Sequence, residues 1–507
     1  MSNRRVRVRF APSPTGPLHI GGVRTALFNY FFAKKNGGDF LLRIEDTDSQ
    51  RFVPGAEEYI NESLSWCGIR IDEGVVEGGK HAPYRQSERR AIYKQYADQL
   101  VASGNAYYAF DAPEVLDAMR KEYEAKKETF TYNYKVRNQL QTSLVLPADE
   151  VKRRIDNGDQ WVIRFKMPEN EEVKMHDLIR GEVTVNTAML DDKVLFKSAD
   201  MLPTYHLANV TDDYLMEISH VIRGEEWLPS LPLHVLLYKA LGWTESMPQF
   251  AHLPLLLKPT GNGKLSKRDG DKMGFPVFPL FWKSPEGETS RGYREDGYFP
   301  EAFVNLLALL GWNPGTEQEI FSMDDLIQQF SLERVNKSGA RFDPEKAKWF
   351  NHQYLMQKDN AELAKQFIKI LSEKGVEAEP ARVEKIVTLM KERVNFVHEL
   401  WDQTSFFFQK PTSYDEASVK KFWKEDTSAI MKESIGIINN INQFEAHEIE
   451  EKIKAFINEK EYGMGKVMNA LRISLVGANK GPGVADICEL IGKEETIERI
   501  NRAITSI

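Results

Sequence analysis

The first sixty residues place a strand, a helix and a second strand in succession, and this order constrains the fold more than any other feature of the chain. In RVRVRF (residues 5–10), apolar and basic residues alternate with the period of two that is typical of a strand. In residues 21–38, apolar side chains recur at helical intervals, and a glycine pair closes the segment where a C-cap is expected. The following FLLRIED (residues 40–46) is a compact apolar run, as in buried parallel strands. The segment therefore predicts a βαβ unit, whose ligands bind beyond the carboxyl ends of its strands.

The stretch RFAPSPTGPLHIGG (residues 9–22) lies at that end and leads into the helix, which we expect to begin near Gly21. A helix N-terminus presents free N–H groups and a partial positive charge, which suit a phosphate. Glycine would let the phosphate approach the backbone closely, and His19 could donate a hydrogen bond to it. The alternative is a proline-rich turn with a capping histidine, and spacing alone does not separate the two. The stretch contains neither GxGxxG nor GxxxxGK[ST], which disfavours a dinucleotide site and a P-loop.

A second candidate phosphate site is GNGKLSKRDG (residues 261–270), a glycine-rich stretch with three basic side chains around Ser266. Alone, this pattern favours a solvated surface loop. Lysines on a mobile loop can also close over a polyphosphate and stabilise the charge that develops on pyrophosphate.

Together, PLHIGG (residues 17–22) and KLSKR (residues 264–268) resemble the two signature motifs of class I aminoacyl-tRNA synthetases, usually named HIGH and KMSKS. The longer context is similar to the bacterial-type glutamyl-tRNA synthetases. Six motifs occur in that family's order: RFAPSPTG, FLLRIEDTD, PYRQSER, PTYHLANVTDD, VIRGEEWL and KLSKRDG. The similarity is dense over residues 4–350 and weakens to a general pattern after that.

This resemblance implies an enzyme that uses ATP with Mg²⁺, L-glutamate and a glutamate tRNA. In the family, glutamate attacks the α-phosphate of ATP to give glutamyl adenylate and pyrophosphate, and the glutamyl group then passes to the 3′ end of the tRNA with release of AMP. Neither step requires a covalent enzyme intermediate or a protein general base. Catalysis would therefore rest on positioning and on stabilising phosphate charge.

The motif match also implies which residues bind ATP. The catalytic residues would be His19, Lys264 and Lys267, with Lys267 facing the leaving pyrophosphate. The ATP-binding set would be Pro12, Ser13, Gly16, His19, Gly21, Gly22, Lys264, Leu265, Ser266, Lys267 and Arg268. Gly22 stands where the motif name has a histidine. We expect this departure to leave more of the phosphate binding to backbone amides.

Glutamate carries two carboxylates and one ammonium, so its pocket needs two cationic or multi-donor sites and one anionic site. By the resemblance, the pocket would be lined by Arg9, Ala11, Ser13, Glu45, Tyr205, Asn209 and Arg223. Glu45 would take the ammonium and the two arginines the carboxylates, in an order that the sequence leaves open. Tyr205 and Asn209 are four residues apart on a predicted helix that begins near Pro203, so they share one face.

Both arginines also have a simpler interpretation. Arg9 could be one of three strand arginines that face solvent, and Arg223 could pair with Glu225 or Glu226. Without the family resemblance this alternative would be favoured.

We expect an α/β fold: a Rossmann-like, parallel-sheet catalytic domain of the class I synthetases with an inserted acceptor-binding domain, followed by an all-α anticodon-binding region. The expected ranges are 1–98 and 191–255 for the two halves of the catalytic fold, 99–190 for the insert, 256–340 for the KLSKR loop and the stem-contact region, and 341–507 for the helical region. Charges alternate in sign along the helical region, so no stripe marks a tRNA face and no anticodon residue can be named.

Two segments depart from the family pattern. Relatives often bind zinc in the insert through a Cys-x-Cys that follows Ala-Tyr, but this chain has Ala109-Phe110-Asp111 there, far from Cys67 and Cys488. We therefore expect no structural zinc and no metal ligands. Residues 276–292 look like an insertion. This segment could pack on the domain as structure, could influence the lysine loop, or could contact tRNA, and we favour the first of these.

Composition and charge indicate which partners and which cellular compartment this protein could have. A net charge of −8 does not suggest a nucleic-acid binder, although a local basic patch suffices for phosphate contacts. The apolar run FVNLLALLGW (residues 303–312) is too short for a membrane helix of about 20 residues. MSNRRVRVRF lacks the apolar core of a signal peptide, and two cysteines fit a reducing cytoplasm. We expect a cytoplasmic monomer that does not contact a membrane.

Three other functions remain to be weighed. A nucleotidyltransferase for small molecules would not need the helical half, and the truncated relative that puts glutamate on a modified tRNA base lacks an anticodon domain. A silent RNA-binding paralogue is disfavoured because His19, Lys267, Arg9 and Arg223 are all present.

Overall fold

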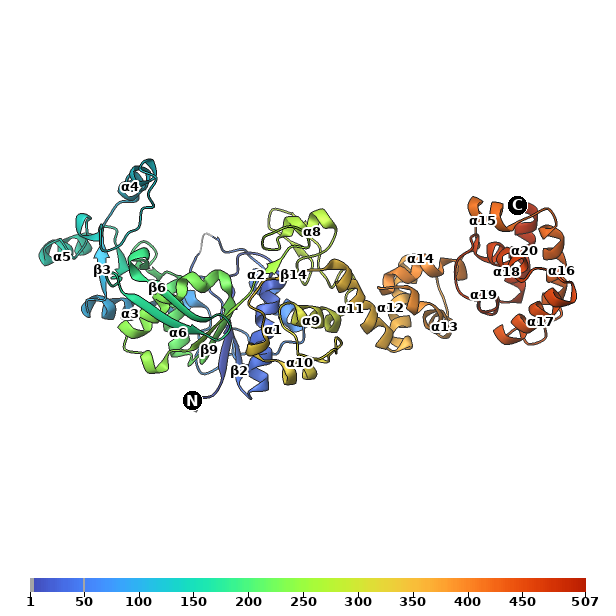
Figure 1. Cartoon of the computed structure of the whole chain (residues 1–507), viewed down its shortest axis with the longest axis horizontal. Coiled ribbons are helices and arrows are strands. Elements are labelled where there is room, and N and C mark those ends of the chain that lie inside the picture. The colour runs from blue at the N-terminus through green and yellow to red at the C-terminus, as the bar shows by residue number, and fades with distance from the viewer. Residues whose placement is uncertain (1–3, 49–50) are drawn as a thin grey trace. The chain divides into compact units, whose positions relative to one another are not determined.

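The structure is a computed structural model that describes residues 4–48 and 51–507. The chain forms two compact units (Figure 1). One contains the residues up to 296 together with 300–347, and the other contains 297–299 with 348–507.

The predicted βαβ unit opens the first compact unit. It consists of β1 (Arg7–Phe10), α1 (Ile20–Lys35) and β2 (Asp39–Leu42), and the two strands are parallel. Helix α1 begins one residue before the predicted start and is closed by Gly37 in the left-handed region at φ 61°. Strand β2 ends at Leu42, which is earlier than FLLRIED predicted. In residues 43–48, which follow this strand, the structure has one isolated β-bridge, between Ile44 and Arg85.

A second sheet lies beside β1 and has the strand order β6-β5-β10-β9. Its strands are β5 (Glu172–Asp177), β6 (Gly181–Asn186), β9 (His220–Gly224) and β10 (Gln249–Leu253). Strand β10 is parallel to both β9 and β5. A backbone hydrogen bond from Ser219 to Arg7 places the start of β9 beside β1. The carboxyl ends of β1, β5, β9 and β10 therefore meet along one edge, where a parallel fold binds its ligands.

Helices cover these strands. Helix α1 packs on β1 and against α9 (Pro300–Leu309) and α10 (Met323–Gln329), while α6 (Tyr205–Leu215) packs against α7 (Leu231–Ala240) (Figure 1). Helices α2 (Ala56–Trp66) and α3 (Arg90–Ala102) also belong to this part of the chain. The predicted helix that carries Tyr205 and Asn209 is thus confirmed as α6.

The insert is built on an antiparallel sheet with the order β3-β4-β7-β8. Its elements are β3 (Ala106–Ala109), α4 (Pro113–Ala125), α5 (Ala148–Asp156), β4 (Val162–Phe165), β7 (Val194–Lys197) and β8 (Leu202–Pro203). Asp111 accepts hydrogen bonds from the Tyr132 hydroxyl at 2.7 Å and the Gln141 N–H at 2.8 Å. In the described part of the chain, no group of three or more His, Cys, Asp or Glu side chains could hold a metal ion.

The segment 276–292 is part of the first compact unit and contributes to its core. Val277, Phe278 and Leu280 are buried, and the Tyr59 hydroxyl donates a hydrogen bond to the Leu280 carbonyl at 2.6 Å. The shorter elements around it are β11 (Leu256–Leu257), α8 (Lys267–Met273), β12 (Trp282–Lys283), β13 (Thr289–Ser290) and β14 (Ala340–Arg341).

The second compact unit is helical over its described residues, which confirms the prediction for the C-terminal region. Helix α11 (Pro344–Gln357) leads into it from the first unit. The others are α12 (Asn360–Glu373), α13 (Pro380–Met390), α14 (Leu400–Thr404), α15 (Glu416–Phe422), α16 (Thr427–Asn439), α17 (Ala446–Glu459), α18 (Met464–Val476), α19 (Val484–Ile491) and α20 (Lys493–Ser506).

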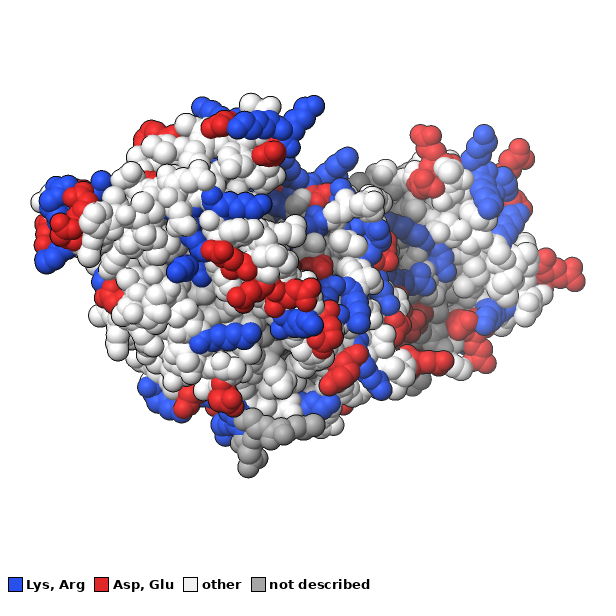
Figure 2. All heavy atoms as spheres, turned by 60° about the vertical axis from the view of Figure 1, so that its left-hand side comes forward, with Lys and Arg blue, Asp and Glu red and all other residues white. Residues whose placement is uncertain are grey.

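Figure 2 shows basic and acidic side chains interspersed over the surface that it displays. Among the described residues, no helix has the length and apolarity needed to cross a membrane.

Candidate active site

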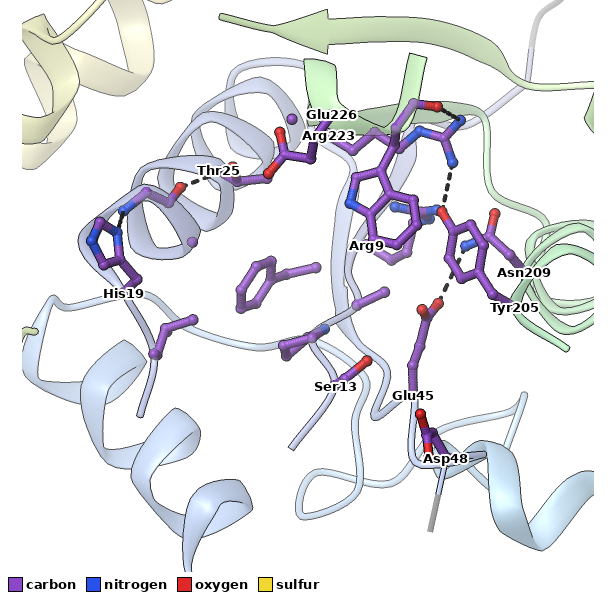
Figure 3. Close-up of a pocket in the computed structure, with 18 of the residues that line it drawn as sticks. Arg9, Ser13, His19, Thr25, Glu45, Asp48, Tyr205, Asn209, Arg223 and Glu226 are labelled. Atoms are coloured by element: carbon purple, nitrogen blue, oxygen red, sulfur yellow. Dashed lines mark hydrogen bonds between the residues drawn. The ribbon is translucent and has the colours of Figure 1, made fainter. Parts of the chain in front are cut away.

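A cavity of about 890 Å³ lies at the carboxyl ends of the parallel strands (Figure 3). It brings together most of the residues that the sequence predicted: Arg9, Ala11, Pro12, Ser13, His19, Gly21, Gly22, Glu45, Tyr205, Asn209, Arg223, Lys264 and Leu265. Four predicted ATP-binding residues are outside its lining, namely Gly16, Ser266, Lys267 and Arg268. The cavity therefore extends from the PLHIGG segment to the predicted amino-acid pocket. Of the KLSKR segment, only Lys264 and Leu265 line it.

His19 is the N-cap of α1 and is set up as a neutral hydrogen-bond donor. Its Nδ1 accepts a hydrogen bond from the Gly21 N–H at 3.1 Å, so the ring proton is on Nε2. Burial, reinforced by the nearby Lys264 charge, lowers the pKa of His19 to about 4, so the ring is neutral at neutral pH. The Nε2 atom is buried and has no hydrogen-bond partner within the described chain. An oxygen of a bound phosphate would satisfy it.

The free N–H groups that we expected at the start of α1 are already occupied. The N–H of Ile20 donates to the Val277 carbonyl at 3.0 Å, that of Gly21 to His19 Nδ1, and that of Gly22 to the His19 carbonyl at 2.8 Å. These three N–H groups are therefore not free for a phosphate in this structure, and phosphate binding by backbone amides here remains a prediction. The glycine at 22 has a packing reason, since a Cβ there would lie 2.6 Å from Leu18 Cδ1.

The KLSKR segment is ordered by a capping box. Ser266 is the N-cap of α8 and exchanges hydrogen bonds with Asp269, whose Oδ2 accepts from the Ser266 N–H at 3.0 Å. Lys264 reaches the cavity and forms an ion pair with Glu226 at 3.0 Å. Lys267 lies 3.8 Å from Glu288 instead. Only the first of the two predicted catalytic lysines thus faces the cavity.

Arg9 is buried and belongs to a chain of alternating charges. It donates two hydrogen bonds to Asp213, with Nε at 2.9 Å from Oδ1 and Nη2 at 3.1 Å from Oδ2. Arg43 donates to the same Asp213 at 2.8 Å and to Glu45 at 3.0 Å. Asn209 then donates to Glu45 Oε1 at 3.2 Å. The alternative that Arg9 faces solvent is wrong, because its side chain is only 4% exposed.

Burial and neighbouring charge act in opposite directions on the two carboxyl groups of this chain. Burial raises the pKa of Glu45 above its usual range, against the opposing effect of Arg43 and Arg9. Burial would also raise the pKa of Asp213, but Arg9 and Arg43 together lower it below its usual range. Asp213 therefore stays ionised and fixes both guanidinium groups.

Sequence reasoning missed Arg43 and Asp213. Their neighbour Asp212 is fully buried too, and it accepts hydrogen bonds from Arg89 Nε at 2.7 Å and the Tyr93 hydroxyl at 2.7 Å. The sequence contains one indication of this buried ion pair, because Arg43 lies inside the apolar run FLLRIED. A buried arginine needs a carboxylate partner.

Arg223 has a different environment. Its Nε donates to His252 Nε2 at 3.0 Å, its Nη1 to the Tyr205 hydroxyl at 2.8 Å and its Nη2 to the Trp227 carbonyl at 3.3 Å. All of these acceptors are neutral, and within the described residues no carboxylate lies at ion-pair distance from this guanidinium. The alternative pairing with Glu225 or Glu226 is therefore wrong.

The cavity thus has two chemically different ends (Figure 3). His19 lies at one end, while Arg223, Tyr205, Arg9 and Glu45 surround the other. A buried guanidinium without a counter-charge favours an anionic ligand group, and the Glu45 carboxylate favours a cationic one. The end at Arg223 therefore suits an amino acid with an acidic side chain, and the end at His19 suits a phosphate.

Comparisons with known proteins agree with this chemistry. The family described as "tRNA synthetases class I (E and Q), catalytic domain" matches residues 5–349, and the family "Anticodon binding domain" matches residues 359–504. A glutamate–tRNA ligase of Flavobacterium johnsoniae is 62% identical over 505 residues, covering 100% of both chains. One of Parabacteroides distasonis is 61% identical, covering 99% of both.

A solved structure is similar along the same length. The crystal structure of a glutamate tRNA ligase from Elizabethkingia meningosepticum, determined in complex with its amino acid, has a TM-score of 0.97 and 56% identity, covering 99% of this chain and 100% of that one. Since the likeness extends over the catalytic and the helical parts alike, this chain belongs to the glutamate–tRNA ligases, the class I synthetases that join glutamate to tRNA.

Proposed function

We propose that this chain activates L-glutamate with ATP in the cavity described above and then transfers the glutamyl group to the 3′ end of a glutamate tRNA. The observation that carries the proposal is the buried Arg223 guanidinium, whose contacts are all neutral, next to the Glu45 carboxylate. A substrate with a side-chain carboxylate and an ammonium satisfies both groups.

The orientation of the bound glutamate follows from the reaction with ATP. The α-carboxylate of glutamate must attack the α-phosphate, so it faces the end of the cavity at His19. The side-chain carboxylate then lies at the opposite end, on Arg223 and the Tyr205 hydroxyl, and the ammonium lies near Glu45 and Asn209 (Figure 3). Arg9, which already holds Asp213, borders the same space as a second donor.

ATP occupies the remaining space along residues 11–13, His19 and α1, with Lys264 and Leu265 on the other side. The His19 Nε2–H donates to a phosphate oxygen. Lys267, with Ser266 and Arg268, reaches the pyrophosphate only after the KLSKR segment moves toward the cavity, since Lys267 now lies at Glu288. Mg²⁺ enters as part of the ATP complex, held mainly by phosphate oxygens.

The other parts of the chain serve the tRNA. In this proposal the β3-β4-β7-β8 sheet and its helices meet the acceptor end, 256–340 contact the stem, and 341–507 bind the anticodon. The expected bounds of the insert, 99–190, need a correction, because β5 and β6 belong to the sheet of β9 and β10, whereas β7 and β8 belong to the sheet of the insert. The enzyme acts as a cytoplasmic monomer without structural zinc.

The test is ATP–pyrophosphate exchange with glutamate, with and without tRNA, followed by charging of purified transcripts of glutamate and glutamine tRNAs. We expect exchange that depends on glutamate and is strongly stimulated by tRNA, and charging of the glutamate transcript. Exchange with no preference for glutamate over other amino acids would refute the proposal. The glutamine transcript reveals whether the enzyme also misacylates it.

A further inference from the structure

Three neighbouring strands end in a row of side chains that leads away from the cavity. Arg223 in β9 and His252 in β10 are direct register partners, and Asp177 ends β5, the next strand along the sheet. All three side chains are buried. The parallel sheet thus places a carboxylate behind a histidine, and the histidine behind the arginine that borders the cavity.

The contacts in this row fix the position of the histidine proton. Arg223 Nε carries a hydrogen and donates it to His252 Nε2 at 3.0 Å, so that ring nitrogen must be bare. The ring proton is then on Nδ1, where Asp177 Oδ2 accepts it at 2.6 Å. Burial and the Arg223 charge lower the pKa of His252 below its ordinary value in spite of Asp177, so the ring stays neutral.

We propose that Asp177 and His252 are positioning residues that hold the Arg223 guanidinium toward the substrate carboxylate without neutralising it, an inference that rests on the proposed function. A carboxylate in direct contact with Arg223 would orient it equally well, but it would compete with glutamate for the same charge. A neutral imidazole accepts a hydrogen bond and leaves the charge for the ligand. Asp177 acts one step further back, because it selects the tautomer that can accept.

The backbone around Asp177 makes this proposal sharply testable. Its Oδ1 accepts from the N–H groups of Ile179 at 2.9 Å and Arg180 at 2.8 Å. In Asp177→Asn the amide oxygen must stay on these two donors, so the NH₂ group faces His252 Nδ1. The ring must then carry its proton on Nε2, where it opposes the Nε–H of Arg223.

We would measure kcat and KM for glutamate in tRNA charging with the full-length chain. Asp177→Asn should raise the KM for glutamate about tenfold or more, as expected for a disrupted hydrogen bond to a charged group, with a much smaller change in kcat. The matched control is Glu182→Gln, which breaks a His–carboxylate contact of the same 2.6 Å length, to His176, on the exposed surface. This control should leave both constants unchanged.

The substitution His252→Gln distinguishes a positioning role from general damage to the fold. Its side-chain carbonyl can accept from Arg223 and has no tautomers, so Asp177→Asn should cost little more when added to His252→Gln. Should Asp177→Asn fail to fold, His252→Gln is compared with His252→Leu, and only the leucine variant should have a strongly raised KM. Unchanged KM in Asp177→Asn, full additivity of the double variant, or equal KM in the glutamine and leucine variants would overturn the inference. A wild-type enzyme that does not charge glutamate would instead refute the proposed function.

Discussion

Arg223→Ala is the substitution that tests the amino-acid pocket most directly. The two candidate substrates, glutamate and glutamine, have nearly the same size, so shape alone separates them poorly. Arg223 can separate them by charge, because its hydrogen-bond acceptors in the protein are neutral and a glutamate carboxylate would be its counter-charge. Glutamine would present a neutral oxygen or an NH₂ group whose donors face those of the arginine.

The expected magnitude follows from the burial of this guanidinium. Unit charges about 4 Å apart attract by about 4 kcal/mol at an effective dielectric constant of about 20. This corresponds to about three powers of ten in kcat/KM for glutamate. Glutamine never forms the pair, so its kcat/KM should fall much less. The ratio of glutamate to glutamine should therefore drop by about a hundredfold or more in Arg223→Ala.

The assay is kcat/KM for each amino acid in tRNA charging, with Arg9→Ala as the comparison. Arg9 already shares Asp213 with Arg43, so its charge is balanced in the absence of substrate. Its removal should impair both amino acids by similar factors and leave their ratio nearly intact. If Arg223→Ala keeps the wild-type ratio, Arg223 does not bind the side-chain carboxylate and our orientation of the substrate is wrong.

Three further perturbations probe the nucleotide end and the buried charges. His19→Ala should slow ATP–pyrophosphate exchange about a hundredfold with little effect on the KM for glutamate; a change confined to that KM would contradict a phosphate role. Lys267→Ala should reduce exchange about as strongly while the Kd for tRNA stays nearly constant, and undiminished exchange would reject closure of the KLSKR segment. Asp213→Asn should lower the free energy of unfolding by about 3 to 5 kcal/mol, measured by chemical denaturation, because Arg9 and Arg43 lose their shared carboxylate. Since the folded pKa of Asp213 is lowered, its stabilising effect is complete above the unfolded value of about 3.9 and is lost as pH falls through the folded value. The free energy of unfolding of this variant should therefore depend less on pH in the acid range. An unchanged pH dependence would contradict the role that we assign to Asp213.

Short-range patterns predicted the elements around the site well. The alternation in residues 5–10 marks β1, and the helical spacing that follows places the start of α1 within one residue. The spacing of Tyr205 and Asn209 put both on one face of α6, and both line the cavity. These features depend on neighbours within a few residues, so they are legible in the sequence itself.

Partners from distant parts of the chain were not predictable in this way. An isolated helix has free N–H groups in its first turn, but here residue 277 supplies the acceptor for Ile20. In the same way, Arg43 and Asp213 are far apart in sequence, and a charged residue is ordinarily assigned to the surface. Their burial follows from tertiary pairing, which the pattern of either segment does not reveal.

The buried charges explain why an acidic amino acid fits this pocket whichever carboxylate meets which arginine. Arg9 and Arg43 contact Asp213 and Glu45, so this chain of four groups balances by itself. Arg223 adds a positive charge whose direct contacts are neutral, and Asp177 reaches it only through the neutral His252. Glutamate, with two carboxylates and one ammonium, brings a net charge of −1 that matches this surplus. Glutamine is a zwitterion without net charge, so it would leave one positive charge of the pocket without a counter-charge, and this holds for any orientation of the bound amino acid.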